Sequence, residues 1–146
     1  METRRNQDPH PDEITFTGEV EGEFKQALLQ HAEFLVLPTK EENFGIVVAE
    51  ALAAGTPVIT TRAAPWEALE IHRCGWWIPG TPEALRHALA SAMTCPAEEL
   101  RMRGERGREY VVRELDWSMI AKRMALFYHW LASGGAIPEF ARPFNQ

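Results

Sequence analysis

Two glutamates, Glu42 and Glu50, lie on either side of Gly45 in this chain. Apolar residues follow the glycine at helical spacing, so we expect a helix to begin near Gly45, with Glu42 in the loop before it and Glu50 about two turns inside. The free N–H groups and positive dipole end of such a helix suit a diphosphate. A carboxylate at Glu50 can accept hydrogen bonds from a ribose diol, and Glu42 can meet the hydroxyls of a sugar. The pattern therefore predicts a site for a sugar nucleotide.

The two carboxylates also have a plainer interpretation, as solvated charges on a helix and its lead-in, because exposed acids are common. The surrounding sequence favours a ligand site. Residues 34–37 form a short apolar run typical of a buried parallel strand, and Pro38 ends it where a crevice opens beyond the strand's carboxyl end. Gly45 then lets the backbone approach a ligand closely.

Strands and helices alternate along the chain and must position these residues. This alternation predicts an α/β fold with a single Rossmann-like parallel sheet and a helical C-terminal segment. Asp116 is a suitable N-cap for the last long helix, whose apolar residues at helical spacing we expect to pack mostly in the core. We expect strands at 14–17, 34–37, 57–60 and 76–78, and helices at 22–31, 45–54, 66–72, 82–92, 97–113 and 117–132.

The region around the two glutamates resembles the E-x7-E signature of retaining glycosyltransferases of the GT-B architecture, of the family 4 or group 1 type. Residues 64–85, APWEALEIHRCGWWIPGTPEAL, resemble the continuation found in members that build lipopolysaccharide and capsular or other surface polysaccharides. The resemblance runs from about Ile14 to the end of the chain. Its motif residues are Glu42 and Glu50 with the flanking Pro38, Phe44, Gly45, Ala51, Gly55, Pro57 and Val58.

The resemblance implies a role for each residue that matches the motif. It implies that Glu42 is the catalytic candidate beside the donor sugar and that Glu50 binds the ribose. It also implies that the backbone of Asn43, Phe44 and Gly45 surrounds the sugar and its phosphates. These assignments agree with the chemistry expected from the residues themselves.

Residues 14–20 hold two further donor-binding candidates, Gly18 and Val20. The resemblance implies that the turn after this expected strand packs against the nucleotide base. The alternative stays open, because a glycine after a strand and a small apolar residue need no ligand.

The resemblance implies that these 146 residues hold one domain of a two-domain enzyme. We expect a polar tail at 1–13, a GT-B C-terminal, nucleotide-sugar-binding domain at 14–133 that lacks its first strand, helix and strand, and a tail at 134–146. The Arg and Lys that neutralise the diphosphate in such enzymes, and the histidine of the acceptor domain, have no matching position. We therefore expect an N-terminally truncated donor domain with little or no transfer activity by itself.

Three functions stay open from the sequence. The chain is the donor domain of a glycosyltransferase of surface polysaccharide or lipopolysaccharide synthesis, a non-catalytic module that binds a nucleotide-sugar, or a decayed remnant. The expected substrate is a UDP- or GDP-sugar, with no cofactor. We expect no metal, because neither an Asp-x-Asp motif nor zinc-ligand spacing is visible.

Large apolar residues near the C-terminus, most of them aromatic, are candidates for a binding surface. The resemblance implies that in the family this segment crosses back to pack on the other domain. Either the tail folds onto its own domain, or it exposes an aromatic patch that self-associates or binds a second chain supplying the acceptor domain. The residues concerned are Trp130, Ile137, Phe140 and Phe144.

One interpretation of Trp66, Trp76 and Trp77 is that their aromatic faces stack on sugar rings. A simpler interpretation is that Trp66 and Glu67 begin a helix, and that Trp76 and Trp77 lie in a short edge strand with one indole on each face.

The composition excludes several classes of protein. With 21 acids against 15 bases and a net charge of −6, the chain lacks the positive surface that nucleic acid requires. It has no run of about eighteen apolar residues and no basic-then-apolar leader, so we expect no transmembrane segment and a cytoplasmic location. We expect Cys74 and Cys95 to be reduced, structural residues.

Overall fold

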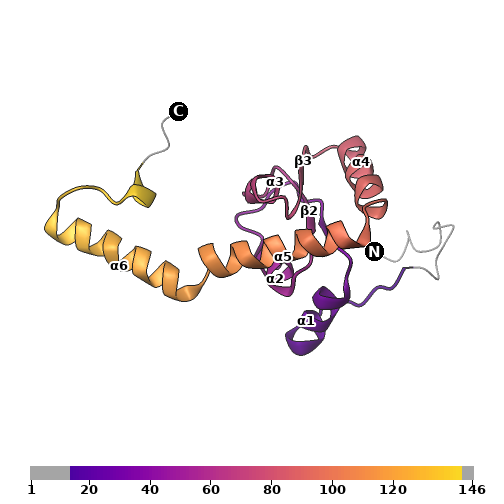
Figure 1. Cartoon of the computed structure of the whole chain (residues 1–146), viewed down its shortest axis with the longest axis horizontal. Helices are drawn as coiled ribbons and strands as arrows, with labels where there is room; N and C mark the ends of the chain where they lie inside the picture. The colour runs from indigo at the N-terminus through magenta and orange to yellow at the C-terminus, as the bar shows by residue number, and fades with distance from the viewer. Residues whose placement is uncertain (1–13, 143–146) are drawn as a thin grey trace.

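The computed structural model describes residues 14–142. This part of the chain contains a three-stranded parallel sheet with helices around it (Figure 1). The strand order is β1-β2-β3, and helices flank the sheet, which confirms the predicted α/β fold. The expected tail at 1–13 and Phe144 lie outside the described residues. The elements are α1 (Gly22–His31), β1 (Leu35–Leu37), α2 (Ile46–Ala54), β2 (Val58–Thr61), α3 (Ala68–Ile71), β3 (Gly75–Ile78), α4 (Pro82–Met93), α5 (Ala97–Glu114), α6 (Trp117–Ser133) and the 3-10 turn η3 (Glu139–Ala141).

The register of the sheet aligns the carboxyl ends of its strands. Leu37 of β1 pairs with Thr60 of β2, and Thr61 pairs with Ile78 of β3. Because the strands are parallel, the loops that follow them, residues 38–45, 62–67 and 79–81, leave from the same edge. In α/β folds this edge is where ligands bind.

Alternate residues of β2 enter two separate apolar cores, as the two faces of a strand require. Val58 joins Leu52 of α2 and Leu69 of α3 in the larger core, against which α5 also packs. Ile59 joins Ala88 and other residues of α4 on the opposite face. The sheet therefore lies between two helical layers.

The two tryptophans of β3 confirm the expected edge strand with one indole on each face. Trp77 packs against the larger core and Trp76 against the smaller one. An arginine guanidinium also lies over each indole ring in a cation–π contact. Cζ of Arg62 lies 5.3 Å from the centre of the Trp77 ring, and Cζ of Arg103 lies 4.7 Å from the centre of the Trp76 ring.

The strand expected at 14–17 is wrong. Residues 14–21 have no regular secondary structure, and β1 pairs only with β2 among the described residues. The alternation of apolar residues and threonine at 14–17 favours an extended chain, but a strand also needs a neighbouring strand with which its backbone N–H and C=O groups can pair. No described strand offers that neighbour to residues 14–17.

Most of the other helices and strands agree with the predicted ranges within two residues, and their ends have local causes. Thr81 caps α4, since its Oγ1 accepts a hydrogen bond from Ala84 N at 3.2 Å. Asp116 caps α6 as expected, accepting from Ser118 N at 2.9 Å. Gly134, with a φ of 71°, ends that helix.

Helix α5 packs unusually close to α2 through two glycines. A Cβ built on Gly104 would lie 1.9 Å from the carbonyl oxygen of Gly55, and one on Gly107 would lie 2.7 Å from Cδ2 of Leu52. These glycines let the two backbones approach. The contact closes the larger core over α2, which carries the candidate site.

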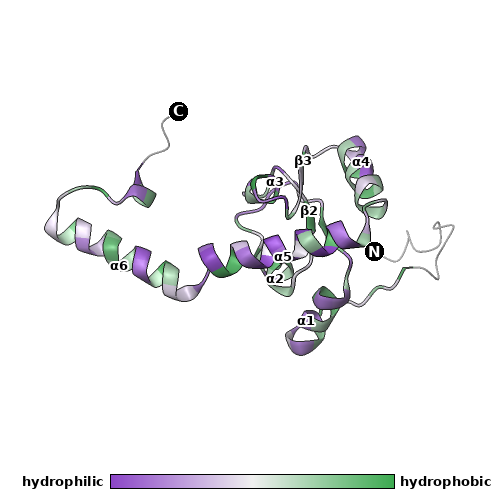
Figure 2. Ribbon diagram, viewed as in Figure 1, coloured by the Kyte–Doolittle hydropathy of each residue, from purple (hydrophilic) through white to green (hydrophobic). Residues whose placement is uncertain are grey.

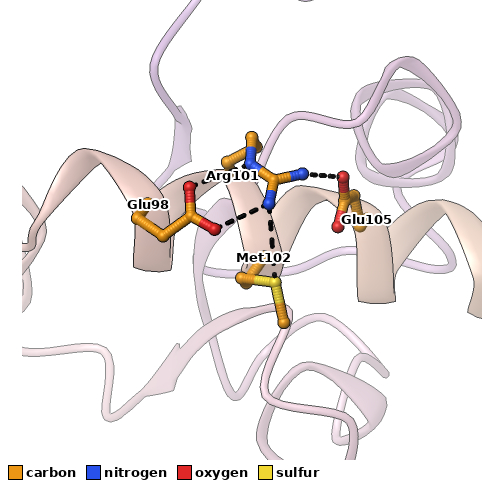
Figure 3. A network of polar contacts seen from close by, with 4 residues as sticks. All are labelled: Glu98, Arg101, Met102 and Glu105. Atoms are coloured by element: carbon orange, nitrogen blue, oxygen red, sulfur yellow. Dashed lines mark hydrogen bonds and ion pairs between the residues drawn. The ribbon is translucent and has the colours of Figure 1, made fainter.

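The outer face of α5 is polar and lies away from that core. Figure 3 shows Arg101 between Glu98, whose Oε1 lies 2.7 Å from Nη2, and Glu105 one turn further along. These contacts have the i,i+3 and i,i+4 spacing of helix-surface pairs. All three side chains are exposed, so the pairs contribute little to stability.

Helix α6 extends away from the sheet as a continuation of α5 (Figure 1). None of its residues is buried, so the expectation that its apolar residues pack mostly in the core is wrong. Figure 2 shows apolar and polar residues alternating along it. The tail after it lies against α6 itself, since Trp130 Nε1 donates to Gly135 O at 3.2 Å and Phe140 lines a hollow with Trp130 and Leu126.

Candidate functional site

The loop at residues 38–45 leads from the carboxyl end of β1 into α2. Gly45 is the N-cap of α2 with φ 77° and ψ 66°, a left-handed conformation that glycine adopts without steric cost. Helix α2 therefore begins at the carboxyl edge of the sheet, and its first N–H groups point toward that edge. The location of the helix start agrees with the sequence prediction.

Hydrogen bonds from the neighbouring strand and loop hold the 38–45 loop in place. The Thr61 hydroxyl at the end of β2 donates to Thr39 O at 2.5 Å, and the Thr39 hydroxyl donates to Glu41 O at 2.8 Å. The indole N–H of Trp66 donates to Phe44 O, and the two rings lie 5.2 Å apart. The loop is thus anchored at both ends rather than free in solvent.

Glu42 folds back over the start of α2. The backbone N–H of Phe44 donates to its Oε1 at 3.4 Å, and its Cγ would lie 3.3 Å from a Cβ on Gly45. The Glu42 side chain is half-buried, while Asn43 is exposed. A carboxylate and the first amides of a helix therefore share one small surface, which suits the hydroxyls and phosphates of a ligand.

Glu50 lies further along α2, on the wall of a cavity of about 380 Å³ between α1 and α2. Its Oε2 lies 2.6 Å from Nζ of Lys25 on α1. The side chains of Lys25 and Glu50 keep 32% and 40% of their exposure, so a ligand can reach both. The cavity is lined by Glu21, Gly22, Lys25, Gln26, Leu29, Gln30, Glu50, Ala53 and Ala54.

The predicted site residues fall into two groups in space. Residues 42–45 gather at the start of α2, and none of them lines the cavity that contains Glu50. Gly18 is exposed with a φ of 72°, and Val20 is half-buried; neither lines the cavity. Their neighbours Glu21 and Gly22 do line it, so the segment borders the cavity through its last residues.

Two residues at the site had no predicted role there. Trp66 precedes α3 instead of beginning it, is 2% exposed and fixes the 38–45 loop through Phe44. Lys25 of α1 forms an ion pair with Glu50 at the wall of the cavity. The strand order could have indicated Trp66, because loops after adjacent parallel strands leave from the same edge. Nothing in the local sequence indicates the pairing of Lys25 with Glu50, which depends on how α1 packs on α2.

Both cysteines are free thiols. Burial raises the pKa of the Cys74 thiol to about 11, so it stays protonated near neutral pH. Within residues 14–142, no three His, Cys, Asp or Glu side chains gather in a way that could hold a metal ion. No helix in this part of the chain is both long and apolar enough to cross a membrane.

Comparison with known proteins gives consistent matches. The family described as glycosyl transferases group 1 matches residues 2–95. Phosphatidyl-myo-inositol mannosyltransferase of Mycobacterium leprae is 32% identical over 131 residues, which cover 88% of this chain and 34% of that protein. The chain thus spans about a third of the length of the curated relatives it matches.

Two solved structures share the fold. The sucrose-phosphate synthase of Thermosynechococcus elongatus superposes with a TM-score of 0.70 at 29% identity, over 85% of this chain and 31% of that one. WaaG, a glycosyltransferase involved in lipopolysaccharide biosynthesis, superposes with a TM-score of 0.57 at 29% identity, over 74% of this chain and 28% of that one. These matches confirm the fold that the resemblance implied.

Proposed function

The chain belongs to the glycosyl transferases group 1 family, and on this premise we propose that it binds the nucleotide-sugar donor of a glycosyl transfer through α2 and the loop before it. The observation that carries this proposal is the start of α2. A left-handed Gly45 turns the chain so that a helix N-terminus opens at the carboxyl edge of a parallel sheet, beside the carboxylate of Glu42.

Each part of the donor meets a different part of this surface in our proposal. The diphosphate lies against the N–H groups at the start of α2, next to Asn43, Phe44 and Gly45. Glu42 meets the hydroxyls of the sugar, and Glu50 accepts hydrogen bonds from the ribose. Gly18 and Val20 stay candidates for contact with the base. We propose no metal or cofactor in addition to the donor.

The proposed chemistry depends on charge at the leaving group. When the bond between the anomeric carbon and the diphosphate oxygen breaks, negative charge grows on the diphosphate. Oriented N–H dipoles at the start of α2 stabilise that charge, and because Gly45 and Trp66 fix the loop beforehand, little reorganisation is needed. Glu42, beside the sugar, is the proposed catalytic residue, with retention of configuration at the anomeric carbon.

We propose a UDP- or GDP-sugar as donor and a surface polysaccharide or lipopolysaccharide as the product. The likeness to WaaG and to a mannosyltransferase supports this substrate class. Because the chain spans about a third of its relatives, we also propose that it transfers little or no sugar by itself. Robust transfer from either donor by the purified chain would contradict that part.

Calorimetric titration of the chain with UDP- and GDP-sugars tests the binding proposal. We expect saturable binding that Glu50→Ala removes and that Glu83→Ala, an exposed acid on α4, leaves unchanged. Binding without transfer agrees both with a donor domain that needs a second chain for transfer and with a non-catalytic module, and transfer that appears when an acceptor domain is supplied would favour the donor domain. If the unaltered chain does not bind at millimolar ligand, the decayed remnant is the better account.

The exposed side chains of α6 support a proposal about partners. Trp117 and Leu131 are 82% and 59% exposed, although both are large and apolar. We propose that this helix associates with a second copy of the chain or with a chain that supplies the acceptor domain. Sedimentation over a wide range of concentrations tests the first of these, and a concentration-independent monomer counts against self-association.

A further inference from the structure

We infer that Lys25 is a positioning residue that holds Glu50 in the orientation required to bind the ribose of the donor. This inference rests on the proposed function, because it assigns Glu50 to a ribose. The Lys25 ammonium lies 2.6 Å from Oε2 of Glu50, although the two residues are on different helices. The pair therefore links α1 to α2 at the wall of the cavity.

The two oxygens of the Glu50 carboxylate differ in their surroundings. Oε2 is shielded from solvent, and Lys25 is its one polar partner among the described residues. The side chain as a whole keeps 40% of its exposure, so Oε1 is the oxygen that a ligand can reach. One oxygen is thus fixed by the protein, and the other is left to accept a hydrogen bond.

The cavity around the pair has the composition of a nucleoside site. Its volume of about 380 Å³ lies in the range of small-molecule sites, roughly 300–1,000 Å³. Leu29, Ala53 and Ala54 give it apolar walls, and the amides of Gln26 and Gln30 add donors and acceptors. Among the described residues that line the cavity, Lys25 alone brings a positive charge, and its ammonium contacts Glu50.

Loss of the ammonium leaves a shielded carboxylate oxygen without compensation. Without the ammonium, no described residue holds this oxygen, so the Glu50 carboxylate turns toward solvent. That rotation moves the hydrogen-bond acceptor out of its position in the cavity. Lys25 therefore acts on the ligand through Glu50, and its effect is confined to the hydroxyls that Glu50 recognises.

The test compares the binding of UDP with that of 2′,3′-dideoxy-UDP, which lacks the diol. We expect the unaltered chain to bind UDP at least about tenfold more tightly than the dideoxy analogue, as a hydrogen bond to a charged group allows. Lys25→Met should weaken UDP by about tenfold, leave the analogue unchanged and so remove the discrimination. Lys25→Arg should restore most of it, and Lys122→Met, on α6, should behave as the unaltered chain.

A double variant strengthens the test. If Lys25 acts through Glu50, then Lys25→Met combined with Glu50→Gln should bind UDP no more weakly than Glu50→Gln alone. Thermal unfolding of each variant verifies that the fold is retained.

The outcomes separate this inference from the proposed function. If the unaltered chain binds neither nucleotide, or if Glu50→Gln changes nothing, the proposed function fails and the inference fails with it. If Glu50→Gln removes the discrimination but Lys25→Met retains it, or weakens both nucleotides equally, the inference alone is overturned.

Discussion

Helices α2 and α6 both carry large apolar side chains, but only α2 has buried ones, Val48 and Leu52. Leu52 of α2 is fully buried beneath the sheet and α5, whereas Leu131 of α6 is 59% exposed. The two helices differ in burial because α2 lies within the domain, whereas α6 extends beyond it (Figure 1). An apolar stripe indicates that a helix needs a partner, but it does not identify the partner. In this chain the helix that is packed into the domain carries the candidate site.

The largest effect expected from this contrast comes from truncating one leucine on each helix. Leu52→Ala should lower the free energy of unfolding by about 3 kcal/mol, because it removes buried apolar contacts and leaves a cavity. Leu131→Ala should change it by less than about 0.5 kcal/mol. Urea denaturation measures both. Equal effects would mean that α6 is covered in solution, as self-association requires, and that the contrast between the two helices holds only within a single chain.

Gly104 sharpens the contrast by testing what covers α2. Gly104→Ala brings a Cβ against the carbonyl of Gly55 and forces α5 away from α2, so we expect a loss of about 2 to 3 kcal/mol in the free energy of unfolding. Gly80→Ala is the control, since a Cβ there meets nothing within 4 Å. An unchanged denaturation midpoint for Gly104→Ala would show that the two helices are less closely packed.

Substitutions at the two ends of α2 distinguish an effect on stability from an effect on binding. Gly45 and Gly55 both have positive φ, 77° and 84°, so alanine at either should cost about 1 to 2 kcal/mol of stability. Only the Cβ on Gly45 meets Glu42 and Trp66, whereas that on Gly55 meets nothing within 4 Å. We therefore expect only Gly45→Ala to weaken nucleotide-sugar binding by titration. Loss of binding in both variants would indicate that strain alone is responsible.

The smallest change in stability is expected when one indole hydrogen bond is removed. Trp66→Phe keeps a ring in the core but removes the donor to Phe44 O, so we expect about 1 kcal/mol less stability and weaker binding through a looser loop. Trp77→Phe removes a similar bond, to Ala64 O at 2.8 Å, outside the 38–45 loop. It should cost similar stability but leave binding unchanged; a binding loss as large as that of Trp66→Phe would argue against the anchoring role.

Much of the fold could be predicted because its signals are local. The caps at Thr81 and Asp116 are contacts between residues near in sequence, and the apolar runs of β1 and β2 are recognisable without knowledge of their neighbours. The start of α2 at Gly45 belongs to the same class. The failed strand at 14–17 shows the limit, because strand formation depends on a partner distant in sequence.

The sequence by itself determined the helix start at Gly45, the positions of Glu42 and Glu50 around it, and the α/β alternation. Tertiary structure decided the rest: that Trp66 fixes the loop, that Lys25 pairs with Glu50, that Glu50 lines a cavity with α1 while residues 42–45 do not, and that no residue of α6 is buried. The physical reason is the range of the contacts. Helix starts and caps depend on neighbouring residues, whereas burial and ion pairs between helices depend on how separate elements pack.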